Sequence, residues 1–371
     1  MEKSKVYFTD FRTRNGYNLL QKLENLIKKA GIETIDFDQK FVAIKIHFGE
    51  YGNLAYLRPN YAKVVVDEVK KLGGKPFLTD CNTLYVGGRK NALDHLDTAY
   101  LNGFSPFSTG CHVIIADGLK GTDEQEVEIN QEYVKTAKIG RAIMDADVII
   151  SLTHFKCHEM TGLGGAIKNI GMGCGSRAGK MEMHNQGKPE VIKEKCRKCR
   201  QCIKICAHGA ISYGEDGKCI IDHNKCVGCG RCIGVCNFDA ITAPNDENGD
   251  ILNKKMAEYT LAVVKDKPQF HISLICDVSP NCDCHAENDV PIVPDIGMLA
   301  SFDPVALDKA CADLVNAQTP IENSALGENI KKDIHEQDNF HTNHPDTNWQ
   351  SQIEHAVKIG LGNAEYELIK V

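Results

Sequence analysis

Short apolar runs alternate with amphipathic stretches along the first 150 residues. The runs are short and bounded by glycine, proline or aspartate, and three of the four are rich in valine and isoleucine, which is typical of buried strands. The runs lie at residues 41–48, 75–80, 111–117 and 147–152. Residues 61–74 and 89–103 have helical periodicity and end on Gly-Gly and Asn-Gly, which are signals that terminate helices. The alternation predicts an α/β domain with a largely parallel sheet and flanking helices.

The character of the sequence changes near residue 187 and changes back near residue 250. The intervening segment is rich in cysteine, lysine and glycine, and helix and strand patterns then return at 253–266, 269–276, 293–301 and 303–316. We therefore predict one α/β domain formed by residues 1–187 and 251–371, with residues 188–250 inserted as a separate small domain. The polar tail at 319–348 is expected to wrap the surface before a last helix near 350–359.

Composition and charge narrow the class of protein. The chain has 371 residues, 42% of them hydrophobic, and its 43 Lys+Arg against 50 Asp+Glu give a net charge of -7. No block of lysine and arginine forms a surface for nucleic acid. The start lacks the basic-then-apolar pattern of a signal peptide, and no apolar run is long enough to span a bilayer. We expect a cytoplasmic protein with neither nucleic acid nor membrane as partner.

Eight of the seventeen cysteines form an internal repeat. The run C-x-x-C-x-x-C-x-x-x-C occurs twice, thirty residues apart. It is the ligand run of two-cluster bacterial ferredoxins, in which three thiolates hold one cluster and the fourth crosses to the other. The pattern predicts one 4Fe-4S cluster on Cys196, Cys199, Cys202 and Cys236, and a second on Cys226, Cys229, Cys232 and Cys206.

Two structural zinc ions are the alternative for these cysteines. Zinc needs only four thiolates per ion and leaves the matched three-residue final gap without a reason. Cys219 lies between the repeats and is expected to be a small buried residue. Because linked clusters carry electrons and have no substrate site of their own, any reaction is expected in the α/β part.

Residues 153–184 are unusually rich in glycine. A P-loop is excluded, because Cys174 stands where the motif needs glycine and Met181 where it needs serine or threonine. The one dinucleotide-type match, at Gly173, has no predicted strand before it. The glycines then indicate a flexible backbone able to approach an anionic cofactor closely. The candidate cofactor-binding residues are Gly164, Gly165, Lys168, Arg177 and Lys180.

Two groups of histidine and cysteine are candidate ligands of an additional metal. His154 and His158 have i, i+4 spacing and would share one face of a helix. Further along, Cys282, Cys284 and His285 lie close together in the sequence. Thiolate and imidazole ligands favour zinc, iron or nickel. The alternative is that the cysteines are buried apolar residues and the histidines are hydrogen-bonded loop residues, and the sequence leaves both open.

Polar side chains follow several of the predicted strands. His47, Asp80 and His154 each come at or just after a strand end, and the carboxyl ends of parallel strands meet at one edge of a sheet. Asp303 is expected to be a helix N-cap. The candidates for catalysis or proton transfer are His47, His154, His158, Lys168 and His184.

Several strings, among them "HFGEYGN", "TDCNTLYVGGR", "CDCH" and "PDIGMLASFDPVALDKA", closely resemble a family of bacterial and archaeal iron-sulfur proteins classed as a domain of unknown function, number 362. The resemblance covers nearly the whole chain, and the cysteine-rich segment lies where that family carries its insert. More distantly, the order His158, Lys168, His184 resembles the central part of the lactate racemase family. In that family the lysine carries a nickel-pincer nucleotide and the following histidine binds the nickel. The resemblance implies a related fold with a pocket around Lys168.

The leading hypothesis is an iron-sulfur redox protein of anaerobic metabolism, and the sequence favours an oxidoreductase without deciding whether it is an enzyme. Two 4Fe-4S clusters would transfer electrons to or from a small-molecule or metal site in the α/β domain. One alternative is an electron carrier that has no catalysis of its own and docks to a partner oxidoreductase. The other is a racemase-like isomerase that depends on a nickel pincer. A redox partner protein is expected, and the sequence leaves the oligomeric state open.

Overall fold

The structure is a computed structural model that describes residues 3–85, 87–185, 188–226, 228, 230–242, 249–332 and 338–371. Its centre is an eight-stranded sheet with the order β16-β1-β15-β14-β7-β2-β3-β4. The strands are β1 (Ser4–Asp10), β2 (Phe41–Lys45), β3 (Lys75–Asp80), β4 (His112–Ile115), β7 (Val148–His154), β14 (Gln269–Ile275), β15 (Gly297–Ser301) and β16 (Tyr366–Lys370). Only β15 runs antiparallel to its neighbours, so the predicted largely parallel sheet is confirmed.

Strands from both sides of the cysteine-rich segment share this sheet. β14 pairs with β7, and β15 pairs with β1, although the cysteine-rich segment separates each pair along the chain. The edge strand β16 and its neighbour β1 were not predicted, because most of their side chains are exposed or only partly buried. The chain therefore leaves the sheet after β7 and returns to it at β14.

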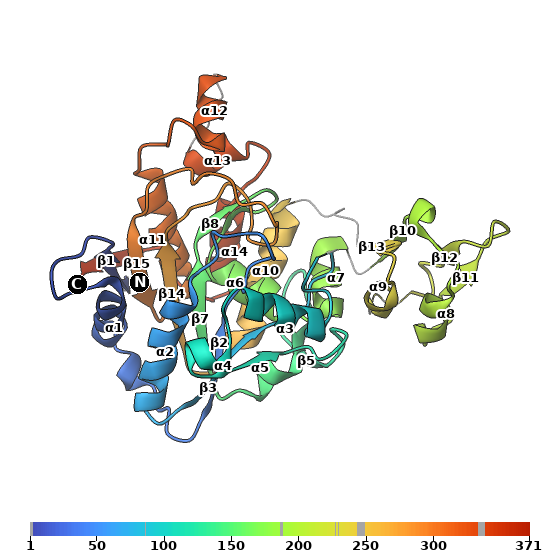
Figure 1. Cartoon of the computed structure of the whole chain (residues 1–371), viewed down its shortest axis with the longest axis horizontal. Coiled ribbons are helices and arrows are strands. Elements are labelled where there is room, and N and C mark those ends of the chain that lie inside the picture. Colours follow the sequence, from blue (N-terminus) through green and yellow to red (C-terminus); the bar gives the residue numbers. More distant parts are fainter. Residues whose placement is uncertain are drawn as a thin grey trace.

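Helices cover both faces of the sheet (Figure 1). Successive strand residues point to opposite faces, so Ile44 and Ile150 share a core with α1 (Leu19–Lys29) and α2 (Pro59–Lys71). Their neighbours Ala43 and Ile149 belong to the other core, which is covered by α6 (Ala166–Cys174), α10 (Gly249–Val264), α11 (Pro304–Asn316) and α14 (Gln350–Lys358). Both faces are thus buried, as expected for an α/β fold.

The remaining elements are short. The helices are α3 (Ala92–Leu101), α4 (Pro106–Thr109), α5 (Arg141–Asp145), α7 (Arg177–Asn185), α12 (Ala325–Lys331), α13 (Asn339–Asn343) and the 3-10 turns Ile32–Thr34 and Lys193–Lys195. The hairpins are β5 (Glu124–Glu128) with β6 (Thr136–Gly140) and β8 (Lys156–His158) with β9 (Gly162–Gly164). The polar tail carries α12 and α13, and residues 333–337 lie outside the described residues. Among the described helices, none has the length and apolarity needed to cross a bilayer.

The glycine-rich stretch is helical, which corrects the expectation of a flexible backbone. Residues 166–174 form α6 and residues 177–185 form α7. A Cβ on Gly171 would collide with the carbonyl oxygen of Met256 in α10, and one on Gly179 with that of Lys138. These two glycines therefore let helix backbones pack closely against their neighbours. That role requires no ligand.

The cysteine-rich residues 188–242 fold into a small unit beside the α/β body (Figure 1). It contains two two-stranded sheets, β10 (Glu190–Val191) with β13 (Ile241–Thr242) and β11 (Ile211–Tyr213) with β12 (Cys219–Ile221), and two short helices, α8 (Gln201–Ile205) and α9 (Arg231–Val235). The residues that precede these helices, Arg200 and Gly230, are both left-handed, at φ 63° and 65°. The thirty-residue sequence repeat is therefore also a repeat of local structure.

A carboxylate from a distant helix fixes the start of α6. Asp308 of α11 accepts hydrogen bonds from the backbone N–H groups of Ala166 (2.6 Å) and Ile167 (2.9 Å). The first N–H groups of a helix have no acceptor within the helix, and the residue before α6 has no side chain that could cap them. A Cβ on Gly165 would collide with the Asp308 carboxylate. Gly165 thus has a packing role in positioning α6, which carries Lys168.

Gly165→Ala is therefore expected to lower the free energy of unfolding by about 1–3 kcal/mol, because Asp308 or the helix must shift. Gly164→Ala is the matched control, since its Cβ would meet only ordinary contacts, the nearest being Cδ of Lys168 at 3.5 Å. Thermal unfolding of both variants tests the assignment. Equal unfolding midpoints would contradict it.

Candidate functional site

A polar cavity lies at the carboxyl ends of β2, β3 and β7, where strand-end side chains were expected to meet. Its walls include Lys45, His47, Asp80, Arg89, His154, Lys156, Gly164, Gly165, Lys168, Lys180 and Cys282. His47, His154, Lys168 and Lys180 from the sequence prediction are thus brought together. We call this the first cavity.

Buried ion pairs hold the lysines of the first cavity in place. Nζ of Lys45, itself 1% exposed, lies 3.0 Å from Oδ1 of Asp80 and 2.8 Å from Oδ1 of Asn169. Burial is the largest single effect and would raise the pKa of Asp80, but Lys45 and the further basic groups around it together lower the pKa below its usual range. Asp80 is therefore a carboxylate at neutral pH.

Asp283 anchors the loop that follows β14. Its fully buried carboxylate lies 2.9 Å from Nδ1 of His154 and accepts a 2.8 Å hydrogen bond from Nζ of Lys156. The other ring nitrogen of His154 lies 2.8 Å from the carbonyl oxygen of Cys276. Both ring nitrogens of His154 thus face an oxygen atom. Burial opposes ionisation of Asp283, yet His154 and Lys156 lower its pKa.

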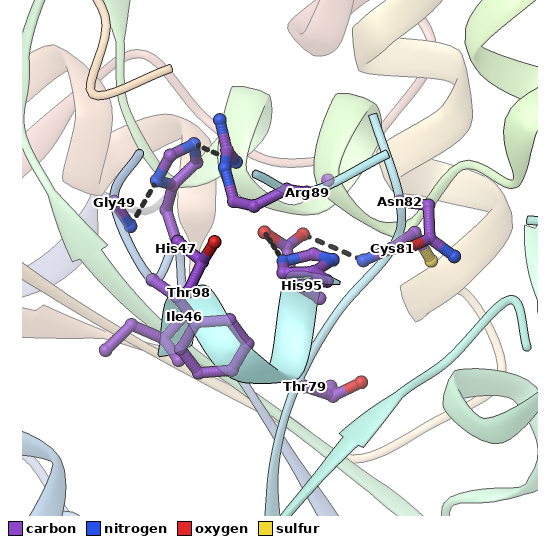
Figure 2. A network of polar contacts seen from close by, with 12 residues as sticks. Ile46, His47, Gly49, Thr79, Cys81, Asn82, Arg89, His95 and Thr98 are labelled. Atoms are coloured by element: carbon purple, nitrogen blue, oxygen red, sulfur yellow. Dashed lines mark hydrogen bonds and ion pairs between the residues drawn. The ribbon is translucent and has the colours of Figure 1, made fainter. Parts of the chain in front are cut away.

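Arg89 and His47 face each other across the cavity wall (Figure 2). Nη1 of Arg89 lies 2.9 Å from Nε2 of His47, and Nε of Arg89 donates to Glu50 at 3.0 Å. A guanidinium only donates, so Nε2 of His47 must be unprotonated, and burial followed by the charge of Arg89 lowers the pKa of His47. Within the described part of the chain, Nη2 of Arg89 is buried and has no partner. Arg89 as a residue lines the first cavity.

The walls of the first cavity carry more positive than negative charge. Lys45, Arg89, Lys156, Lys168 and Lys180 all line it, whereas Asp80 is the one carboxylate among the described lining residues. Asp283 and Glu50 stand behind the walls and pair with Lys156 and Arg89. The cavity therefore suits a small anion.

A second, larger cavity of about 440 Å³ lies between the α/β body and the cysteine-rich unit. The body contributes His158, Glu159, Lys168, His184, Cys284 and His285, and the cysteine-rich unit contributes Ile192, Lys195, Asp239, Ile241 and Thr242. Lys168, Tyr85 and Met172 line both cavities. The two cavities thus adjoin at Lys168.

His158, Lys168 and His184 meet at the second cavity. The expected shared helical face of His154 and His158 is wrong, because both lie in strands, and the two imidazoles line different cavities. Burial and then the charge of Lys168 lower the pKa of His184 to about 3. Its Nδ1 is buried and has no hydrogen-bond partner among the described residues. His184 is therefore a neutral imidazole with a free ring nitrogen.

The Cys282–His285 loop brings its side chains to Lys168. Nζ of Lys168 lies 3.5 Å from Sγ of Cys282. A hydrogen bond from Cys284 lowers the pKa of Cys282, and Lys168 lowers it further, although burial acts the other way. Cys284 and His285 approach Glu159, and ligand atoms of these three residues lie within 4.8 Å of one another. Glu159 was not predicted as a metal ligand, because the sequence gives no signal for it except its position beside His158.

The family of the chain can be stated at this point. A family model described as a domain of unknown function (DUF362) matches residues 42–313, which include every residue of both cavities named above. The chain belongs to this family. None of the curated proteins compared with it matches.

Two solved structures are similar to this DUF362 protein. A crystal structure of a Thermotoga maritima protein has 12% identity and a TM-score of 0.40 over 79% of this chain. The chain spans 57% of the length of that protein. The lactate racemase apoprotein of Thermoanaerobacterium thermosaccharolyticum has 11% identity and a TM-score of 0.45, over 94% of this chain and 81% of its own.

Arg177 of the DUF362 chain lies away from both cavities. Its side chain is fully buried and donates to the carbonyl oxygens of Lys120 (3.0 Å) and Lys90 (2.5 Å). It also packs against Gly230 and Gly234 of the cysteine-rich unit. Arg177 therefore joins the two parts of the protein, a contact that its place in a glycine-rich stretch did not indicate.

Three cysteines of the repeat, Cys202, Cys232 and Cys236, lie in the core of the small unit, whereas Cys199 is exposed. Cys206, Cys226 and Cys232 line one cavity. The backbone N–H of Cys219 points at Sγ of Cys196 (3.5 Å), and its own Sγ lies 3.6 Å from Sγ of Cys202. Cys219 is buried, as expected. Cys229 lies outside the described residues.

Asp283→Asn is expected to lower the free energy of unfolding by about 3–5 kcal/mol at pH 7, because the buried ammonium of Lys156 would lose its counter-charge. The pKa of Asp283 lies below the usual 3.8, so its contribution is lost only as pH falls below about 4. The difference in unfolding free energy between the variant and the unmodified protein, measured by denaturant unfolding, should therefore be equal at pH 7 and pH 5. Asp266→Asn, at an exposed carboxylate, is the control. A deficit that shrinks between pH 7 and 5 contradicts the assignment.

Proposed function

We propose that this DUF362 protein is an iron-sulfur redox protein. Two 4Fe-4S clusters held by residues 188–250 would exchange electrons with a small anionic molecule bound in the α/β body. The single observation that carries the proposal is the second cavity, whose walls come from both the cysteine-rich unit and the body. A site formed by both units is what electron transfer between them requires.

The cysteine geometry supports cluster binding. Three of the four thiols assigned to the second cluster, Cys206, Cys226 and Cys232, face the same cavity although Cys206 belongs to the other repeat. The arrangement is consistent with the fourth ligand of one repeat joining the cluster of the other, as in two-cluster ferredoxins. When bound, such clusters supply one-electron transfer, and the thiolates of the chain hold them.

One predicted ligand of the first cluster lies next to the second cavity. Nζ of Lys90 donates to the carbonyl oxygen of Cys236 at 3.0 Å and forms an ion pair with Asp239. Both Lys90 and Asp239 line the second cavity. The first cluster, on Cys196, Cys199, Cys202 and Cys236, is therefore proposed as the one nearer the substrate.

The charges of the first cavity favour an anion such as a carboxylate or phosphate. Nη2 of Arg89 and Nζ of Lys168 would bind the anion, since the first is unpartnered among the described residues and the second lies where the cavities adjoin. Lys156 is already paired with Asp283. Burial keeps the imidazoles of His47 and His184 uncharged, so both would line the anion site as neutral polar groups.

A racemase-like isomerase is a second candidate. The specific observation that favours it is the meeting of His158, Lys168 and His184 on one wall, with Nδ1 of His184 free among the described residues. By resemblance to the lactate racemase family, Lys168 would carry the pincer nucleotide and His184 would bind nickel. Nickel in the purified protein and an added mass on the Lys168 peptide would favour this candidate over electron transfer.

Protein purified without oxygen is expected to contain about eight irons and eight sulfides per chain, and to give a low-temperature EPR signal after reduction by dithionite. Cys206→Ser and Cys236→Ser should each disturb one cluster and lower the iron content. Cys219→Ala should retain all the iron, because Cys219 is outside the repeat. Fewer than about six irons in the unmodified protein would sink the two-cluster proposal.

The variant Lys168→Ala distinguishes a protein that binds an anion in its pocket from an electron carrier without a ligand. We expect phosphate or a small carboxylate, compared with chloride at equal ionic strength, to raise the unfolding midpoint of the unmodified protein. A concentration ten times the dissociation constant adds about 1.4 kcal/mol. Lys168→Ala should lose this response and keep its iron, whereas Lys29→Ala, at an exposed lysine, should keep both. If no anion stabilises the unmodified protein, the carrier alternative is favoured.

A further inference from the structure

We infer that Glu159, Cys284 and His285 form a binding site for one divalent transition metal, zinc or iron(II), on the wall of the second cavity. Each residue offers a ligand atom, and these atoms lie within 4.8 Å of one another. Nε2 of His285 lies 3.1 Å from Oε1 of Glu159. Carboxylate, thiolate and imidazole together are ligands that suit zinc or iron.

The backbone around the three ligands is fixed before any metal binds. Asp283, between Cys282 and Cys284, is locked to His154 and Lys156, and its carbonyl oxygen accepts from the N–H of Glu50 at 2.9 Å. Nδ2 of Asn53 donates to the carbonyl oxygen of His285 at 2.9 Å. A site whose ligand-bearing loop is already held loses little conformational entropy on binding.

Glu159 is tied to the same loop from the other side. Its Oε2 lies 3.4 Å from the N–H of Cys282, and its Oε1 lies 3.7 Å from Nε2 of His158. The carboxylate thus lies near two imidazoles and the thiol of Cys284. A plain surface ion pair between Glu159 and His285 would need neither Cys284 nor the buried anchor at Asp283.

Three protein ligands leave a coordination position open. Glu159, Cys284 and His285 all line the second cavity, so that position faces the space between the two units. Catalytic zinc sites have this arrangement, with water or substrate in the fourth position, whereas structural sites are closed by four protein ligands. The metal would act as a Lewis acid on a substrate oxygen. That role rests on the proposed function, but metal binding itself does not depend on the clusters.

The test uses Co²⁺, which differs from the cluster iron in elemental analysis and X-ray absorption. Anaerobic protein dialysed against Co²⁺ is expected to hold one cobalt per chain, and the cobalt absorption edge should show one sulfur neighbour at about 2.3 Å. Cys284→Ser should remove the sulfur neighbour. Glu159→Gln and His285→Ala should weaken cobalt binding by about tenfold or more. His112→Ala, at an exposed histidine on β4, is the matched control and should bind like the unmodified protein.

Iron is measured in the same samples, so this inference and the proposed function can fail separately. No bound cobalt in unmodified protein overturns the metal site, whatever the iron content. Cobalt binding that all three ligand variants leave unchanged also overturns it, because the cobalt then lies elsewhere. One cobalt with fewer than about six irons supports the metal site and rejects the two-cluster proposal.

Discussion

The position of the candidate chemistry depends on the buried carboxylate of Asp283. It contacts two buried side chains, His154 at the end of β7 and Lys156 in β8, and the ammonium of Lys156 needs its charge. A charge in the protein interior is tolerated only when it is paired, so the loop after β14 must stay where these side chains are. The pairing brings Cys282 next to Lys168 and presents Cys284 and His285 to the second cavity. One ion-pair cluster thus determines the geometry of both cavities.

Helix α7 links the cavity to the cysteine-rich unit. Arg177 at its start packs against that unit, and His184 near its end lines the second cavity, about 11 Å further along the helix axis. Lys90 makes a second link through the carbonyl oxygen of Cys236. Because a helix is rigid over such a length, the position of the small unit and the position of His184 are mechanically coupled.

The glycines of residues 162–179 illustrate why a composition can mislead. Their density indicated a flexible loop, but Gly165, Gly171 and Gly179 each face a side chain or backbone from a distant element. The absence of a Cβ makes close packing possible as readily as flexibility, and one-dimensional information does not distinguish the two. The helical spacing expected of His154 and His158 failed for a similar reason, since β7 ends between them.

What the sequence by itself determined was local or periodic. It determined the strands β2, β3, β4 and β7, the N-cap at Asp303 and the doubled cysteine spacing, because burial on a sheet, helix capping and ligand runs each leave a short-range pattern. Only the tertiary structure decided that Glu159 lies with Cys284 and His285, that Asp308 caps α6, and that Arg177 joins the two units. These contacts join segments far apart in the sequence. They depend on the order of strands in the sheet, which no local pattern encodes.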